Sequence, residues 1–175
     1  MLETIQSLDF SLLDLIAAHR FEAATNVMTV VTRLGDNGVL WLAIALILCL
    51  FKKTRRTGVL MIAALAATFV ISTLGLKHLF SRLRPCVAEP EKTFLFCPSG
   101  YSFPSGHSVS SFAAAGVLWF RRQNGAFAAM IAAFLIAFSR VYLFVHFPTD
   151  VLTGAILGFA TAYAVCEYAK KRLNY

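Results

Sequence analysis

Five apolar stretches without a charged side chain occupy most of the chain after residue 37. Several are shorter than the ~20 residues that cross a bilayer as a helix. Flanking residues can extend each stretch, because long charged side chains reach the interface while their stems stay in apolar surroundings. The pattern therefore predicts five membrane-spanning helices, around residues 38–51, 58–76, 109–120, 126–138 and 151–166.

The first 37 residues carry apolar side chains at helical spacing, first from Phe10 to Ile16 and again from Phe21 to Leu34, with a break near His19 and Arg20. We interpret them as two amphipathic helices that lie at the outer membrane interface, with a sixth spanning helix as the alternative. Charged residues interrupt both series too often for a simple crossing: Asp9, Asp14, Arg20, Glu22 and Arg33.

The composition agrees with a membrane protein, because 58% of the 175 residues are hydrophobic and 14% are charged. We expect an all-α integral membrane helical bundle in a single domain, residues 1–175, with amphipathic helices over 1–37 and a transmembrane core with the active site over 38–169. The net charge of +7 does not indicate nucleic acid binding, because nine of the sixteen Lys and Arg residues end apolar runs. They form three basic clusters: Lys52, Lys53, Arg55 and Arg56; Arg121 and Arg122; Lys170, Lys171 and Arg172.

Five crossings place all three basic clusters on one side of the membrane, which the positive-inside rule assigns to the cytoplasm. The loop over residues 80–103 and the junction near His146 then lie together on the outer side. The N-terminus has no positively charged segment before an apolar one and no small-residue cleavage site, so we expect no removable signal peptide.

Polar residues of catalytic type gather on the predicted outer side. Lys77 and Arg84 are seven residues apart, or two helical turns, and point the same way if their helix continues to Pro85. Either cation alone is as readily explained by a side chain that reaches the interface.

The second group is Pro104, Ser105, Gly106 and His107. Proline fixes φ, serine caps a helix and glycine lets a ligand approach the backbone, so the stretch opens a helix whose free N–H groups can face an anion. A plain helix start is the alternative, but an ionisable His107 in the first turn of a membrane helix is a functional candidate.

The third group contains Arg140, His146 and Asp150. A carboxylate one turn from an imidazole can accept its Nδ1–H and leave Nε2 free to attack, and Pro148 between the two predicts the start of the last helix. The alternative is a helix-capping aspartate beside an interfacial histidine. That alternative explains neither Arg140, whose charge is costly to bury without an anionic partner, nor the presence of all three groups on one side.

Together the three groups resemble one family. Lys77 to Pro85 matches K-x6-R-P, Pro104 to His107 matches P-S-G-H, and Ser139 to Asp150 matches S-R-x5-H-x3-D, which are the motifs of the type 2 phosphatidic acid phosphatase (PAP2) superfamily. The resemblance implies that His146 is the nucleophile of a phosphohistidine intermediate, that Asp150 orients it and that His107 is the general acid. It assigns phosphate binding to Lys77, Arg84 and Arg140, with the Ser105 hydroxyl and the backbone N–H groups of Ser105 and Gly106.

The same resemblance implies a phosphatase that needs no cofactor and no metal, because three cations and a helix N-terminus can neutralise a phosphoryl group. Two other functions remain open from the sequence. A vanadate-dependent haloperoxidase can share such a pocket, although the apolar runs disfavour it. A protein that binds or flips phospholipids would need the cations but not His107, His146 and Asp150.

The expected partners are the bilayer and a phosphorylated membrane lipid. The resemblance to compact bacterial enzymes implies the bacterial inner membrane, with several crossings and a periplasmic site. It favours undecaprenyl diphosphate as the substrate, with phosphatidylglycerophosphate and lipid A 1-phosphate as alternatives. Oligomeric state is not predicted.

The four cysteines divide into two pairs. Cys49 and Cys166 lie in apolar stretches and are expected to pack there. Cys86 and Cys97 both lie in the outer loop, in an oxidising compartment, so we predict a disulfide between them.

Overall fold

The computed structural model describes residues 2–93 and 97–173, and within them the chain is helical and contains no strand. The α-helices are α1 (Leu2–Ala18), α2 (Glu22–Leu34), α3 (Val39–Leu50), α4 (Arg55–Thr68), α5 (Lys77–Phe80), α6 (Pro85–Ala88), α7 (Gly106–Phe120), α8 (Ala126–Tyr142) and α9 (Pro148–Leu173). Two 3-10 turns, η1 (Asp36–Gly38) and η3 (Pro90–Lys92), and one π-helix, η2 (Phe69–Leu76), join some of them.

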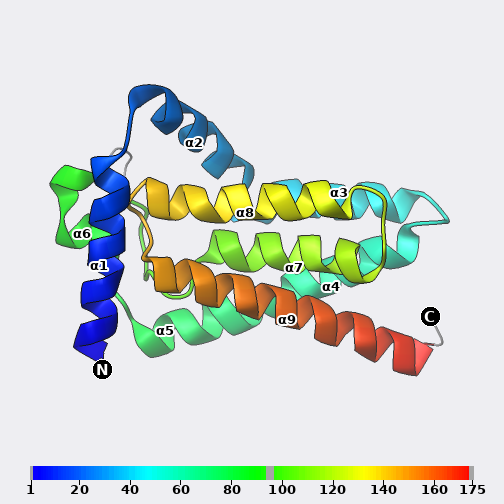
Figure 1. Ribbon diagram of the computed structural model, residues 1–175. Coiled ribbons are helices and arrows are strands. Elements are labelled where there is room, and N and C mark those ends of the chain that lie inside the picture. Colours follow the sequence, from blue (N-terminus) through cyan, green and yellow to red (C-terminus); the bar gives the residue numbers. More distant parts are fainter. Residues whose placement is uncertain (1, 94–96, 174–175) are drawn as a thin grey trace.

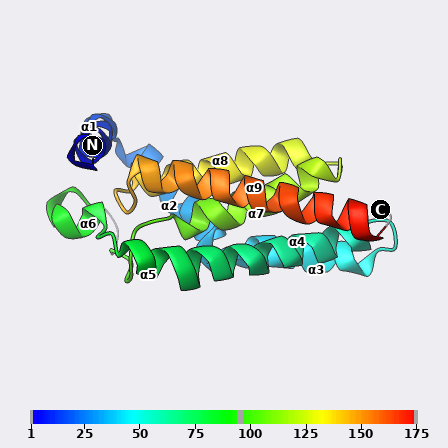
Figure 2. The same cartoon turned by 90° about the horizontal axis from the view of Figure 1, so that it is seen from below.

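Five of these helices, α3, α4, α7, α8 and α9, run side by side as a bundle (Figures 1 and 2). Helix α7 packs against α4, α8 and α9 and is the most enclosed. Its contact with α9 is close, because a Cβ on Gly158 would lie 2.3 Å from the Val109 carbonyl oxygen. Glycine therefore lets the two backbones approach, as small residues do between membrane helices.

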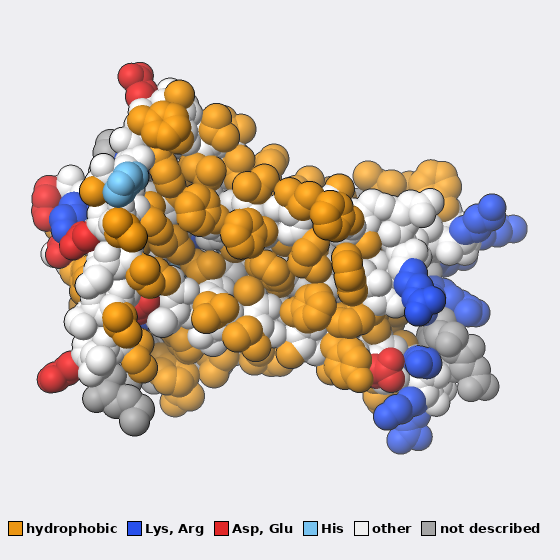
Figure 3. Space-filling model, viewed as in Figure 1, with side chains coloured by type: hydrophobic (Ala, Val, Ile, Leu, Met, Phe, Trp, Pro, Cys, Tyr) orange, Lys and Arg blue, Asp and Glu red, His pale blue; other side chains and the backbone are white. Residues whose placement is uncertain are grey.

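The bundle confirms the prediction of an all-α membrane protein. Three helical segments are long and apolar enough to cross a bilayer, namely Glu22–Leu50, Arg55–Ala88 and Pro148–Arg172, and Ala126–Tyr142 is a shorter apolar helix. Apolar side chains cover the middle of the visible face, whereas Lys and Arg side chains gather at the end near the C-terminus (Figure 3). That end also contains the α3–α4 and α7–α8 turns, where the other two basic clusters lie (Figure 1).

The N-terminal helices lie at the opposite end. Helix α1 ends at Ala18 and α2 begins at Glu22, so the predicted break near His19 is confirmed. Figure 1 shows α1 lying across the end of the bundle and α2 inclined to it. One face of α1 is buried, with Asp9 and Leu13 almost inaccessible, while Leu8, Leu12 and Leu15 are exposed. Helix α1 is therefore amphipathic, with one face packed on the bundle.

The helix that carries Lys77 is too short to give Lys77 and Arg84 a shared face. The helix ends at Phe80 and does not reach Pro85, because Ser81 adopts the left-handed conformation with a φ of 45°. The chain then turns, and Arg84 comes to the site from a non-helical segment. Lys77 and Arg84 therefore do not share a helix face.

Candidate active site

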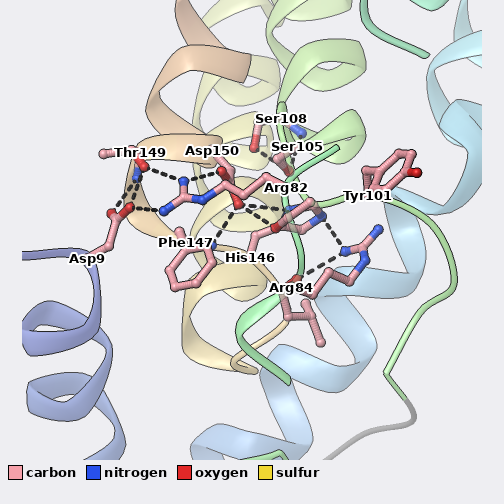
Figure 4. Close-up of polar contacts among 12 residues, drawn as sticks. Asp9, Arg82, Arg84, Tyr101, Ser105, Ser108, His146, Phe147, Thr149 and Asp150 are labelled. Carbon is pink, nitrogen blue, oxygen red and sulfur yellow. Dashed lines mark hydrogen bonds and ion pairs between the residues drawn. The ribbon is translucent and has the colours of Figure 1, made fainter. Parts of the chain in front are cut away.

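His146 lies in the turn between α8 and α9 and is 2% exposed. Its two ring nitrogens have different neighbours: Nε2 lies 2.8 Å from Nη1 of Arg84, and Nδ1 lies 3.2 Å from the Ser102 hydroxyl oxygen (Figure 4). An arginine can only donate, so Nε2 accepts and the ring proton belongs on Nδ1. This tautomer presents the Nε2 lone pair to the same space as the Arg84 guanidinium.

Burial lowers the pKa of His146 well below its ordinary value of 6.5, and the charges of Arg84, Arg140 and Lys77 lower it further. The ring therefore stays neutral at pH 7. A neutral imidazole keeps the lone pair that a nucleophile needs.

Asp150 is fully buried in the first turn of α9. Its Oδ2 accepts hydrogen bonds from the Ser102 hydroxyl at 2.5 Å and from the Phe147 backbone N–H at 3.0 Å. The expected direct bond to His146 is not formed, because Nδ1 is 3.6 Å from Oδ2, which is too long for a hydrogen bond. The Ser102 hydroxyl instead accepts from Nδ1–H and donates to the carboxylate, so it links the two side chains.

The three predicted phosphate-binding cations lie around His146, and none of them forms an ion pair with a carboxylate of the described residues. Arg84 Nε donates to the Gly100 carbonyl oxygen at 3.0 Å, Lys77 Nζ donates to that of Tyr101 at 2.9 Å, and Arg140 Nη1 donates to the Thr32 hydroxyl at 2.5 Å. Arg84 and Arg140 are each only 5% exposed. Arg140 Nε is also buried, and no described residue accepts from it. Buried cations with neutral acceptors leave positive charge for an anion.

The Pro-Ser-Gly-His stretch opens α7 as expected, with Ser105 at the N-cap. The Ser105 hydroxyl accepts from the Ser108 hydroxyl at 3.1 Å, and the Ser105 N–H donates to the Asp150 carbonyl oxygen at 3.1 Å. Ser105 thus connects α7 to the turn that carries Asp150. Gly106 faces open space, since a Cβ there would have no described atom within 4 Å.

His107 follows in the first turn of α7, and its Nε2 lies 3.0 Å from Oδ1 of Asp36. It lines a pocket of about 490 Å³ that extends from Gly106 and His107 between α3, α4 and η2. The pocket lining also includes apolar side chains of α3 and α4, namely Leu42, Ile62 and Leu65. A larger apolar groove of about 860 Å³ on α7, α8 and α9 contains none of the predicted site residues.

Four residues of the site were not predicted from the sequence as participants: Asp9, Asp36, Arg82 and Ser102. Asp9 was seen only as an interruption of an apolar series, yet its buried carboxylate contacts Arg82. Ser102 lies two residues before Pro104, outside the three motifs. The sequence carries no local signal for these carboxylates, because Asp9 lies 73 residues from Arg82 and Asp36 lies 71 residues from His107.

The segment between α5 and α7 contains the predicted disulfide. Cys86 and Cys97 are joined, with Cα atoms 5.7 Å apart, whereas Cys49 and Cys166 are free thiols. The bond closes the part of the loop that follows Arg84, including α6 and η3.

We expect the loop cysteines to resist alkylation in protein taken from its native compartment. Under denaturing conditions without reductant, a maleimide should label the peptides that contain Cys49 and Cys166 but not those that contain Cys86 and Cys97. Peptide mass mapping before and after reduction checks this, and the two free thiols serve as internal controls. Labelled loop cysteines in unreduced protein would contradict the prediction.

Comparison with known proteins agrees with this site. The family model of the PAP2 superfamily matches residues 57–174. A curated undecaprenyl-diphosphatase of Sulfolobus acidocaldarius is 30% identical over 149 residues, which cover 84% of this chain and 71% of that protein. A lipid A 1-phosphatase of Rhizobium etli is 33% identical over 86% of this chain and 76% of its own length.

A solved structure also resembles the whole chain. The crystal structure of a transmembrane PAP2-type phosphatidylglycerolphosphate phosphatase from Bacillus subtilis superimposes with a TM-score of 0.81 and 28% identity, covering 97% of this chain and 88% of that one. The family model, the relatives and the shared fold lead to one conclusion: the chain belongs to the PAP2 superfamily of membrane lipid phosphatases.

Proposed function

We propose that the protein removes phosphate from the headgroup of a membrane lipid through a phosphohistidine at His146, and that undecaprenyl diphosphate is its preferred substrate. The observation that carries the proposal is the group of three cations around His146. Lys77, Arg84 and Arg140 contact neutral acceptors, and Nε2 of His146 opens to the same space. A phosphoryl group supplies the missing anion and places phosphorus beside the nucleophile.

In the first step, Nε2 of His146 attacks phosphorus. The bond between phosphorus and the leaving oxygen breaks, its electron pair stays on that oxygen, and His107 donates a proton to it. For a lipid diphosphate the leaving group is the lipid monophosphate. In the second step His107 takes a proton from water, the water oxygen attacks phosphorus, and inorganic phosphate leaves as the N–P bond breaks.

The pocket beside His107 supports a lipid as the leaving group, because its lining combines His107 and Ser110 with apolar side chains of α3 and α4. A polyprenyl lipid has a single chain, whereas a glycerophospholipid has two, and we infer that this pocket of about 490 Å³ takes the single chain. The undecaprenyl-diphosphatase of S. acidocaldarius is consistent with this choice.

Phosphate release from defined lipids tests the function. Purified protein is assayed with undecaprenyl diphosphate, phosphatidylglycerophosphate and lipid A 1-phosphate at one detergent concentration, with EDTA present throughout. We expect phosphate from all or some of them, with the highest kcat/KM for undecaprenyl diphosphate. A higher kcat/KM for phosphatidylglycerophosphate or lipid A 1-phosphate would identify that lipid as the preferred substrate. Phosphate release from none of the three lipids would favour a protein that binds or flips lipids.

We also propose that the site faces the outside of the inner membrane. The basic clusters at the far end of the bundle support this orientation through the positive-inside rule (Figure 3). The reaction would then draw on lipids of the outer leaflet.

Cysteine labelling tests the orientation independently of activity. With Cys49 and Cys166 replaced by alanine, Glu91→Cys should react with an impermeant thiol reagent from outside, and Gln123→Cys should react only after the membrane is opened. Both should react in lysed cells, which controls for buried thiols. The reverse labelling pattern would show that the site faces the cytoplasm and would contradict this orientation.

A further inference from the structure

Arg82 connects the N-terminal helix to the catalytic carboxylate. Its Nη2 lies 2.6 Å from Oδ2 of Asp9 on α1, and its Nη1 lies 2.6 Å from Oδ1 of Asp150 on α9 (Figure 4). Both carboxylates are buried, with exposed fractions of 1% and 0%. A buried carboxylate needs a charged or hydrogen-bonded partner, and one guanidinium serves both.

Asp9 also holds the start of α9 directly. Its Oδ1 accepts from the Thr149 backbone N–H at 3.0 Å, and its Oδ2 accepts from the Thr149 hydroxyl at 2.5 Å. Thr149 lies in the first turn of α9, where backbone N–H groups lack partners within the helix. A carboxylate from α1 therefore caps the turn that carries Asp150, and the positive end of the helix dipole favours its charge.

Aromatic packing fixes the guanidinium from one side. Arg82 Cζ lies 3.9 Å from the centre of the Phe147 ring, and Phe10 of α1 packs edge-on against that ring at 5.1 Å. The Phe147 ring restricts the orientation of Arg82, and Phe10 supports that ring. The guanidinium then contacts both Asp9 and Asp150. The Ser102 hydroxyl links Asp150 in turn to Nδ1 of His146.

We propose that Arg82 and Asp9 are positioning residues of the reaction, and that the docking of α1 on the bundle thereby sets the orientation of His146. Neither side chain contacts the reacting nitrogen. They act by fixing the Asp150 carboxylate, which holds Ser102 and, through it, the Nδ1–H tautomer of His146. This inference rests on the proposed function, in which His146 is the nucleophile.

A second ion pair on α1 provides a matched control. Asp14 pairs with Lys92 of the outer loop at 2.6 Å, so it also tethers α1, but its carboxylate is half exposed and does not contact Arg82 or α9 in the described chain. Loss of Asp14 weakens docking of α1 without touching Asp150. A purely structural role for Asp9 predicts that the two carboxylates behave alike.

The test compares Asp9→Asn, Arg82→Gln and Asp14→Asn on the lipid that the wild type hydrolyses best. Loss of a residue that orients a catalytic group costs ~10- to 100-fold. We expect that loss in kcat and in the rate of phosphoenzyme formation for Asp9→Asn and Arg82→Gln, with KM within about twofold and little change for Asp14→Asn. The double variant Asp9→Asn/Arg82→Gln should lose little more than Arg82→Gln alone, because the two residues act in one chain.

Equal losses for Asp14→Asn and Asp9→Asn, or losses confined to KM, overturn the proposal. If Arg82→Gln does not fold in detergent, the comparison of Asp9→Asn with Asp14→Asn still distinguishes a positioning role from a structural one. If the wild type releases no phosphate from any lipid, the proposed function fails separately. Nitrogen NMR of labelled histidine then reads the His146 tautomer, and an unchanged tautomer in Asp9→Asn and Arg82→Gln overturns the positioning role.

Discussion

Replacement of His146 by alanine is expected to abolish lipid phosphate release and the acid-labile phosphoenzyme together. Nε2 of His146 lies 2.8 Å from Nη1 of Arg84, and the lowered pKa of His146 keeps its ring neutral. In enzymes that use a covalent nucleophile, its removal costs on the order of 10⁴- to 10⁶-fold in kcat. The loss should be seen with every substrate, because each one needs His146 to attack phosphorus, whatever its leaving group.

Phosphate release and trapping of labelled phosphoenzyme in a quenched gel measure both effects. His19→Ala is the matched control, because His19 is exposed just after α1 and its ring bonds the nearby Leu15 carbonyl oxygen, away from the site. A His146→Ala enzyme that still forms phosphoenzyme would falsify the assignment of the nucleophile.

Replacement of His107 by alanine is expected to have an effect that depends on the leaving group. General-acid catalysis is typically worth ~10² to 10⁴ in rate and matters most when the departing oxygen is strongly basic. A lipid alkoxide needs the proton, whereas an activated aryl oxide is stable without it. His107→Ala should therefore lose much more activity on a lipid monoester than on an aryl phosphate.

The measurement compares kcat/KM for wild type and His107→Ala on both substrates. His146→Ala, assayed in parallel, should be inactive on both and so distinguishes loss of the acid from loss of the nucleophile. Equal losses on the two substrates for His107→Ala exclude it as the general acid and leave it a binding or structural role beside Asp36.

Those parts of the fold and site that depend on local patterns were predictable from the sequence. Apolar stretches located the helices of the bundle because a lipid-facing helix must be apolar over a fixed length. Pro148 and Ser105 marked the starts of α9 and α7, because proline and serine have defined roles at helix starts.

What the sequence did not predict depends on contacts between distant segments. Asp9 reaches Thr149 across 140 residues, and Asp36 reaches His107 across 71. No periodicity links such pairs, since each is formed only when α1 and η1 pack on the end of the bundle that holds His146. The end of α5 was missed for a similar reason: Ser81 has a left-handed backbone that serine rarely adopts, and the surrounding contacts of Arg82 and Arg84 hold it there.

The pocket beside His107 has a consequence for the direction of the proposed reaction. Its lining includes the apolar side chains of Leu42, Ile62 and Leu65 on α3 and α4, and Leu42 is exposed, whereas the cations that would hold phosphate lie around His146. The dephosphorylated lipid would therefore remain in the bilayer while inorganic phosphate diffuses into water. Partition into two phases keeps the products from meeting again at one site, so hydrolysis is driven forward by their separation as well as by the chemistry of the bond.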